Sequence, residues 1–174
     1  VRTALGPANQ SKPCTALVTA LTLLADRLEG VVTTNLDSIL EAAFSWRVEL
    51  DLSPGTAIRE RVVKVHGTLD KPATWVLTRQ QYSLKYLGNA PYRDRFLAMY
   101  NHSTLMFIGY GMQDVELDSI LEWIEGNYQA HQQPRHFFFV HEDDESNSPY
   151  FFRRLQALGL RPVLYLRREI RARA

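Results

Sequence analysis

Cysteine is almost absent from this sequence: Cys14 is the single cysteine among 174 residues. One cysteine cannot close an internal disulfide, and it cannot form a zinc site built from several thiolates. A lone cysteine also suits a reducing compartment, so we expect the protein to work in the cytoplasm.

Long apolar runs and an excess of charge of one sign are absent as well. No apolar run approaches the roughly 20 residues that span a bilayer, and no positively charged start precedes an apolar stretch as in a signal peptide. Lys and Arg number 20 against 19 Asp and Glu, a net charge of +1. We therefore expect no membrane partner, and the net charge gives no reason to expect nucleic acid.

What the sequence does contain is an alternation of apolar strands with helices. Hydrophobic residues make up 45% of the chain, typical of a globular domain with a buried core. Continuous apolar strands separated by helices indicate a parallel sheet covered on both faces. We predict an α/β, Rossmann-like, doubly wound fold with a mainly parallel sheet, and a single domain over residues 1–174. The expected strands are residues 31–34, 61–65, 104–108, 136–140 and 162–166.

Local signals predict where several helices begin and end. Leucines recur at helical spacing before Gly30, which is expected to form a left-handed helix cap. Ser38 and Glu41 have the spacing of a capping box at the start of the next helix. Helical material is expected from Arg79 to about His102 and again from Asp114. The apolar positions of the first and last helices are Leu17, Leu21, Leu24 and Leu28, and Phe151, Phe152, Leu155 and Leu158, the last closed by Gly159.

Polar residues and glycines directly follow the predicted strands, at the edge where doubly wound sheets bind ligands. They are Asn35 and Asp37, His66, residues 109–114, and the acidic stretch from His141 onward. Each also has a purely structural interpretation. Asn and Asp favour turns and helix starts, a histidine before glycine fits a tight turn, and glycines allow close packing. The acidic stretch is typical of a solvated loop, since nothing fixes a metal-ligand geometry there.

Taken together, three segments resemble the sirtuin family, and specifically sirtuin-like proteins of bacterial defence systems. Thr33-Thr34-Asn35-Leu36-Asp37-Ser38-Ile39-Leu40-Glu41 resembles the motif in which a strand ends in Asn-x-Asp. Val63-Lys64-Val65-His66-Gly67-Thr68-Leu69 resembles the strand that delivers the catalytic histidine. Phe107-Ile108-Gly109-Tyr110-Gly111-Met112-Gln113-Asp114 resembles the glycine turn that contacts the nucleotide. The three occur in sirtuin order, and Tyr82 adds to the likeness.

The resemblance implies an enzyme that cleaves the bond between nicotinamide and ribose in NAD. In that reaction Asn35 would position the ribose and the attacking water, and Asp37 would hold the carboxamide of nicotinamide. His66 would be the general base, a role that suits an imidazole because its ordinary pKa of about 6.5 leaves it largely neutral at physiological pH. The residues assigned to NAD binding are Thr34, Gly109, Tyr110, Gly111 and Asp114, although Asp114 could simply cap its helix.

Two departures from the sirtuin pattern bear on the function. No Gly-x-Gly sequence precedes Val31, so the phosphate loop that opens sirtuin domains is expected either to lie upstream of this sequence or not to exist. Sirtuins that deacylate proteins carry four zinc-binding cysteines between the histidine and the glycine turn. Residues 67–108 contain no cysteine, so we expect no such zinc site.

These departures favour hydrolysis of NAD to nicotinamide and ADP-ribose over deacylation. The resemblance further implies a role as effector in antiviral defence, with a fused or separate sensor as partner. Two alternatives remain: a non-catalytic nucleotide-binding or scaffold domain, and a zinc-free deacylase or ADP-ribosyltransferase. The sequence leaves the oligomeric state open.

Arginines crowd the C-terminal part of the chain, where clustered arginine could neutralise phosphate. They are Arg153, Arg154, Arg161, Arg167, Arg168, Arg171 and Arg173. A strand is expected between them, so we interpret residues 167–174 as a linker rather than as a nucleic-acid site.

The cysteine content generates a direct test. With Cys14 alone, the purified protein should contain no stoichiometric zinc, because a tetrahedral thiolate site needs several cysteines. Elemental analysis of the dialysed protein measures this. A tightly bound zinc at a one-to-one ratio would contradict the zinc-free assignment.

Overall fold

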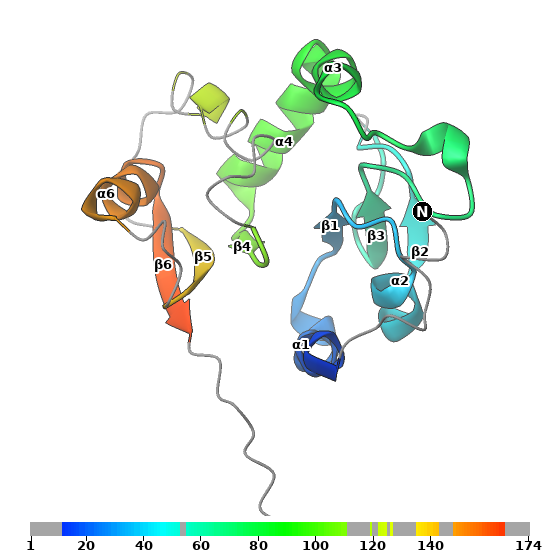
Figure 1. Ribbon diagram of the computed structural model, residues 1–174, viewed down its shortest axis with the longest axis horizontal. Coiled ribbons are helices and arrows are strands. Elements are labelled where there is room, and N and C mark those ends of the chain that lie inside the picture. The colour runs from blue at the N-terminus through cyan, green and yellow to red at the C-terminus, as the bar shows by residue number, and fades with distance from the viewer. Residues whose placement is uncertain are drawn as a thin grey trace, which may run out of the picture. The chain divides into compact units, whose positions relative to one another are not determined.

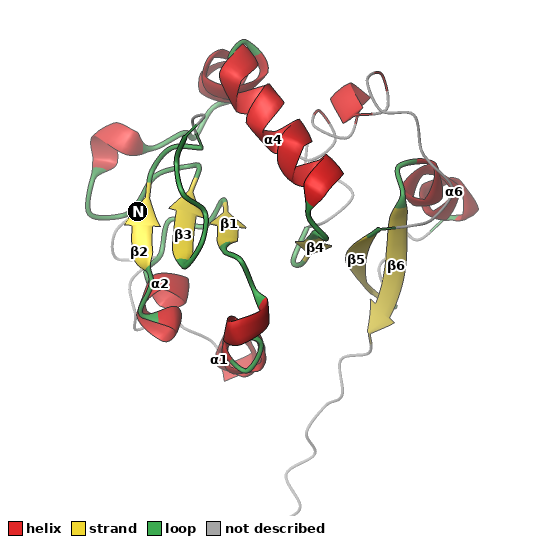
Figure 2. Ribbon diagram, turned by 180° about the vertical axis from the view of Figure 1, so that it is seen from behind, coloured by secondary structure: helices red, strands yellow, loops and turns green. Residues whose placement is uncertain are grey.

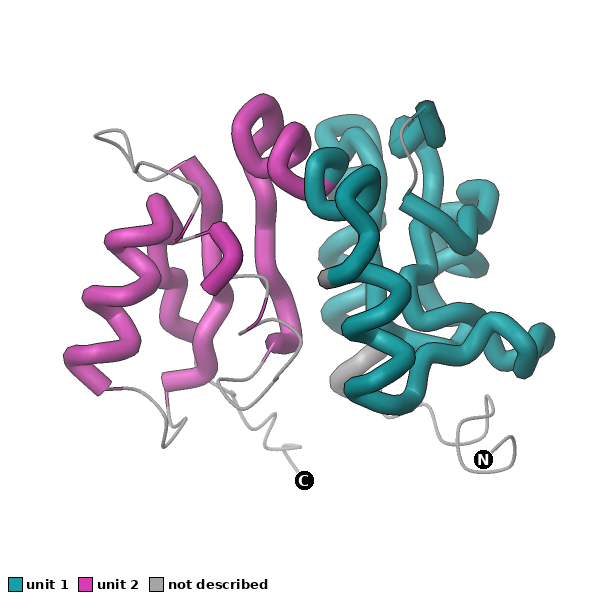
Figure 3. Tube along the Cα trace, turned by 90° about the horizontal axis from the view of Figure 1, so that it is seen from above, with its two compact units in different colours: residues 1–95 teal, residues 96–174 magenta. Residues whose placement is uncertain are grey.

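The computed structural model describes residues 12–52, 55–110, 135–142 and 148–165, together with residues 119, 122–124 and 126. The chain divides into two compact units, residues 1–95 and residues 96–174, coloured teal and magenta in Figure 3. The boundary between the units falls within helix α4 (Ala90–His102).

The first unit contains a three-stranded parallel sheet in the order β1-β3-β2. Its strands are β1 (Val31–Thr33), β2 (Arg47–Glu49) and β3 (Arg61–Lys64). Both edge strands pair with β3 in parallel, and Thr33 lies opposite Lys64. Figure 2 shows the three arrowheads at the same edge of the sheet. All three strands therefore deliver their following residues to one edge.

Helices and irregular segments surround this sheet, as Figure 1 shows. They are α1 (Lys12–Thr22), η2 (Ala25–Arg27), α2 (Ile39–Phe44), η3 (Pro72–Thr74), α3 (Arg79–Tyr82) and the π-helical η4 (Ser83–Leu87). The core of the unit is apolar because β3 is covered on both faces, with Val62 and Val63 fully buried. The other buried hydrophobic residues described in this unit are Val18, Phe44, Leu52, Val65, Val76, Tyr82, Tyr86 and Tyr92.

Two predictions for this unit need correction, and one strand was missed. The leucine stripe does not lie on one buried helical face: α1 ends at Thr22, and Leu17 and Leu24 are exposed. Gly30 is not a left-handed cap, because its φ is not positive. A Cβ at Gly30 would instead overlap the Ile58 carbonyl, so close backbone approach requires glycine there. Strand β2 was not predicted, because its side chains are largely exposed and polar.

The segment predicted as helical from Arg79 onward is helical but interrupted. Thr78 and Gln81 form a reciprocal capping box at the start of α3, and η4 follows directly. Helix α4 then begins at Ala90, after a break at Gly88 and Asn89. The predicted helical content from Arg79 to about His102 is therefore confirmed, divided among α3, η4 and α4.

The second unit contains a parallel sheet in the order β4-β5-β6. Its strands are β4 (Met106–Phe107), β5 (His136–His141) and β6 (Leu160–Tyr165), joined in part by α6 (Pro149–Ala157). Helix α6 is capped by Ser148, and Gly159 closes it at a φ of +69° as predicted. The core cluster is Tyr100, Phe107, Ile124, Phe138, Val140, Phe151, Leu155, Leu158 and Leu160.

The predicted α/β, Rossmann-like class with parallel sheets is confirmed. Every pairing between the named strands of the described ranges is parallel, and helices occur between strands in both units. The predicted helix from Asp114 begins outside the described residues, although residues 122–124 are helical. In the part of the chain that the structure describes, no helix is long and apolar enough to cross a membrane.

A buried histidine supports the second core. His136 is 1% exposed, its ring lies 4.1 Å from the Tyr100 ring, and its Nδ1 accepts a hydrogen bond from the Leu105 N–H (3.1 Å). An accepting Nδ1 belongs to a neutral ring protonated at Nε2. Burial, with a smaller contribution from the nearby Arg135, lowers the pKa of His136 to about 4, and the Tyr100 backbone partly opposes this.

This shift predicts how stability depends on pH. In the unfolded chain the histidine pKa is about 6.5, so the unfolded state binds more protons than the folded state between about pH 4 and pH 6.5. The free energy of unfolding should therefore fall as the pH decreases through that window. His136→Gln should weaken this dependence, whereas His102→Gln at an exposed position should not. Equal slopes for wild type and His136→Gln in urea titrations would contradict the assignment.

Candidate functional site

The predicted catalytic residues directly follow two neighbouring strands and lie at one edge of the first sheet. Asn35 and Asp37 follow β1, and His66 follows β3. Because β1 and β3 pair in parallel with Thr33 opposite Lys64, both segments emerge at the same edge. The structure therefore brings the two motifs together, as the sequence predicts.

Backbone hydrogen bonds continue past the strands and hold the two segments side by side. The Val65 N–H donates to the Thr33 carbonyl, and the Leu69 N–H donates to the Leu36 carbonyl, each at 3.0 Å. The Asn-x-Asp loop (residues 35–37) and the histidine turn (residues 64–67) are thus held together by bonds that also involve Thr33 and Leu69, just outside them. Their relative position is set by the backbone.

Asp37 starts helix α2 in place of the predicted capping box. Its Oδ1 accepts a hydrogen bond from the Ile39 N–H (3.1 Å), whereas Ser38 makes no side-chain cap. The capping-box prediction for Ser38 and Glu41 is therefore wrong. Asp37 performs that structural role because an Asx side chain reaches the N–H two residues on. The bond also orients the carboxylate through one of its two oxygens.

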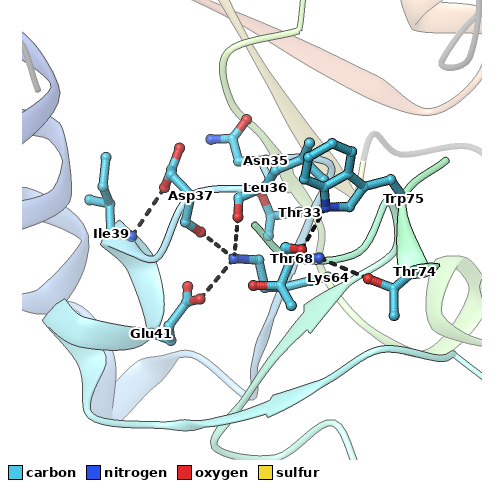
Figure 4. A network of polar contacts seen from close by, with 10 residues as sticks. All are labelled: Thr33, Asn35, Leu36, Asp37, Ile39, Glu41, Lys64, Thr68, Thr74 and Trp75. Atoms are coloured by element: carbon cyan, nitrogen blue, oxygen red, sulfur yellow. Dashed lines mark hydrogen bonds and ion pairs between the residues drawn. The ribbon is translucent and has the colours of Figure 1, made fainter. Parts of the chain in front are cut away.

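The side chains of the loop differ in exposure. Asn35 is exposed, and its backbone N–H donates to Thr33 Oγ1 (3.1 Å). Thr34 and Asp37 are half-buried. Figure 4 shows the Asn35 amide and the Asp37 carboxylate on the side of the loop away from Glu41. The Asn35 side chain is therefore accessible to solvent, and that of Asp37 is accessible in part.

Lys64 is a component of the site that the sequence prediction missed. Its side chain is fully buried, and its Nζ donates to the Leu36 carbonyl (3.1 Å), to the Asp37 carbonyl and to Glu41 Oε1 (2.7 Å), as Figure 4 shows. The available signal was a charged residue inside the apolar run Val62-Val63-Lys64-Val65. A lysine in a strand buried on both faces requires partners.

His66 lies in a tight turn directly after β3. The Gly67 N–H donates to the Lys64 carbonyl (3.1 Å), and the Val76 N–H donates to the His66 carbonyl (3.1 Å). Gly67 has a φ of +92°, and a Cβ there would overlap the Thr74 carbonyl. The predicted tight turn is therefore present, and glycine is required in it for both conformation and space.

Aromatic rings surround the histidine, which is only 8% exposed. Its ring centroid lies 6.1 Å from that of Tyr82 in an edge-on arrangement and 6.3 Å from that of Tyr86. Tyr86 in turn packs on Tyr92 at 4.3 Å. Buried aromatic contacts of this kind restrict the rotamer of the imidazole and keep bulk water from much of its surface.

A lysine also lies beside the histidine turn. Lys85 Nζ donates to the Val65 carbonyl (3.1 Å) and lies 5.2 Å from the centre of the Tyr86 ring. Burial lowers the pKa of Lys85, and the negative charge of Asp51 opposes that change. The interaction connects η4 to the residue before His66 and so supports the turn from a second element.

The predicted nucleotide-binding residues of the second unit are described only in part. Gly109 is exposed with a φ of +77°, which favours glycine, and Tyr110 is half-buried with its ring 6.5 Å from that of Phe107. Gly111 and Asp114 lie outside the described residues, as does most of the acidic stretch after Glu142. Among the residues described, no group of three or more His, Cys, Asp or Glu side chains could hold a metal ion.

Comparison with known proteins adds independent findings. The family profile of the SIR2-like domain matches residues 29–163. The chain is 26% identical over 121 residues to the NAD(+) hydrolase ThsA of Bacillus cereus (strain MSX-D12), covering 64% of this chain and 25% of that protein. It is 28% identical over 130 residues to the NAD(+) hydrolase ThsA of Acinetobacter baumannii (strain 532279), covering 68% of this chain and 27% of that protein. The chain thus spans about a quarter of the length of these relatives.

The geometry of the histidine turn predicts the effect of a single methyl group. Gly67→Ala should lower the free energy of unfolding by more than about 1 kcal/mol, because it combines a positive φ with a backbone overlap. Gly88→Ala is the matched control, since Gly88 has a φ of −77° and its Cβ would make only ordinary contacts. Chemical denaturation compares the two. Equal stability of both variants would show that the turn does not require glycine.

Proposed function

The chain belongs to the SIR2-like domain family, and we propose that it binds NAD and hydrolyses it to nicotinamide and ADP-ribose. The observation that carries the proposal is that Asn35, Asp37 and His66 lie at one edge of the sheet. They follow two parallel strands in which Thr33 lies opposite Lys64. The likeness to two proteins named as NAD(+) hydrolases supports the same reaction.

The reaction would break the bond between the ribose C1′ and the nicotinamide nitrogen. The bonding electrons leave with nicotinamide, and positive, oxocarbenium-like charge develops on the sugar. A water oxygen then forms the new bond to C1′ and gives up a proton. Rate is gained by holding the leaving group and the water in reactive orientation, which requires polar groups in defined positions.

Asn35 and Asp37 would orient the substrate. The exposed amide of Asn35 offers both a donor and an acceptor, to the ribose and to the attacking water. The Oδ1 of Asp37 is engaged with Ile39, so Oδ2 would accept from the nicotinamide carboxamide N–H. Because that same hydrogen bond fixes the carboxylate, little reorganisation would be needed when the substrate binds.

His66 would receive the proton as general base. The resemblance to sirtuins assigns it this role, and its position directly after β3, on a turn held by Gly67, supports the assignment. The neighbouring rings of Tyr82 and Tyr86 would exclude bulk water from the imidazole. Thr34, Gly109, Tyr110, Gly111 and Asp114 stand as the proposed NAD-binding residues, with no zinc taking part.

The wider setting of the reaction is part of the same proposal. We propose NAD depletion in the cytoplasm as an antiviral defence activity, controlled by a fused or separate sensor. The alternative of a scaffold domain is favoured by one observation, the capping bond of Asp37, which gives that residue a structural role without any substrate. NAD consumption in the absence of acyl-lysine would distinguish hydrolysis from deacylation.

Substitution of the catalytic pair tests the proposal in the full-length protein that contains these residues. His66→Ala should lower the turnover number for nicotinamide release about 100-fold or more, the usual scale for loss of a general base. Asn35→Ala should be comparably damaging, since misorientation of reactants can cost about 100-fold. Nicotinamide release from NAD is followed by chromatography.

Stability and a matched variant serve as controls. Asn35 is exposed, so its truncation should leave the melting temperature near that of the wild type, and melting of His66→Ala is measured alongside. Gln80→Ala removes an exposed carboxamide on α3 and should retain activity. Wild-type turnover by a folded His66→Ala protein would overturn the proposed mechanism.

A further inference from the structure

Lys64 is a buried cation whose bonds are directed at the Asn-x-Asp loop. It lies at the end of β3, fully buried, beside the equally buried Val62 and Val63. An ammonium group has three N–H donors, and each has an acceptor here: the Leu36 carbonyl, the Asp37 carbonyl and Glu41 Oε1. Two of the three acceptors are thus backbone atoms of the loop itself.

We propose that Lys64 is a positioning residue for NAD cleavage, which holds the Asn35-Leu36-Asp37 backbone so that the Asn35 and Asp37 side chains face the substrate. The inference rests on the proposed function for its chemistry. Its geometry rests on the three hydrogen bonds of Nζ and on the burial of the side chain.

The bonds act on the part of the loop that determines side-chain direction. The Leu36 carbonyl belongs to the peptide that enters Asp37, and the Asp37 carbonyl belongs to the peptide that leaves it. Fixing both peptides fixes the direction of the Cα–Cβ bond of Asp37 between them. The Leu36 carbonyl also accepts from the Leu69 N–H (3.0 Å), so the loop is anchored both from β3 and from the segment that follows the histidine turn.

A purely structural ion pair would not require this arrangement. Burying a charge pair carries a large desolvation cost, and apolar residues of similar volume often replace such a pair without loss of stability. Apolar side chains could fill the space of Lys64 and Glu41, but they could not donate to the two loop carbonyls. A purely structural role and a positioning role for Lys64 therefore predict different results when apolar residues replace the pair. The first predicts unchanged turnover, and the second predicts a loss of turnover.

Lys64→Met combined with Glu41→Met is the decisive variant, examined in the full-length protein. Lys64→Met alone would leave the Glu41 carboxylate without its cation and could prevent folding. The double variant removes both charges and keeps the apolar volume. If Lys64 positions the loop, its turnover number should fall about 10- to 100-fold. KM for NAD should stay within about threefold of the wild-type value, because the alignment of the loop by Lys64 is needed in the transition state.

An ion pair between β3 and β2 provides the control. Arg61 begins β3, at the opposite end of that strand from the loop, and its Nε lies 3.4 Å from Oε1 of Glu49, the last residue of β2. Arg61→Met combined with Glu49→Met removes the same two charges without touching the loop. This variant should retain the wild-type turnover number. Equal turnover by both double variants, with both folded, would overturn the proposal.

Amide hydrogen exchange separates the positioning role from the proposed function. In the Lys64→Met/Glu41→Met protein, peptides that cover residues 35–39 should exchange faster than in the wild type, while those that cover residues 61–63 keep their protection. Unchanged exchange in the loop would overturn the positioning role whatever the activity. If the wild type releases no nicotinamide, the proposed function fails, and the exchange measurement alone supports or overturns the anchoring of the loop by Lys64.

Discussion

The parallel pairing of β1 with β3 is the constraint on which the candidate site depends. With Thr33 opposite Lys64, the chain leaves both strands at one edge, and the polar loop after β1 runs beside the histidine turn after β3. A shift of one residue would exchange the faces of the strand and turn Lys64 away from its partners. The burial of Val62 and Val63 opposes such a shift, so the packing of the core also sets the register of the site.

The two sides of the site are held by different physical means. The Asn-x-Asp loop is polar, and its carbonyls are anchored by a buried ammonium and a backbone N–H. The histidine turn is held instead by the conformation of Gly67 and by the packing of Tyr82 and Tyr86. A loop that must present side chains to a ligand cannot be packed over, so directed hydrogen bonds hold it from beneath.

Much of this arrangement could be predicted from the sequence, and the failures have physical causes. The apolar strands and the residues that follow them were predictable, because strand ends bring Asn35 and His66 to one edge in any parallel sheet. Glu41 was assigned to a capping box because sequence spacing shows only local partners, whereas its actual partner, Lys64, is 23 positions away. Gly30 was assigned to a helix cap for the same reason, since its contact with Ile58 is also non-local.

Asp37 shows how a structural and a catalytic role can share one side chain. Its Oδ1 starts α2, its backbone carbonyl is held by Lys64, and its Oδ2 is the group proposed to bind the nicotinamide carboxamide. The capping bond alone would be satisfied by Ser or Thr at many helix starts. Those residues have a single side-chain oxygen, which the cap would occupy. A carboxylate has two, so one oxygen can orient the group while the other faces the substrate. The capping bond that favours a scaffold role is therefore also the bond that would orient the Asp37 carboxylate before the substrate binds.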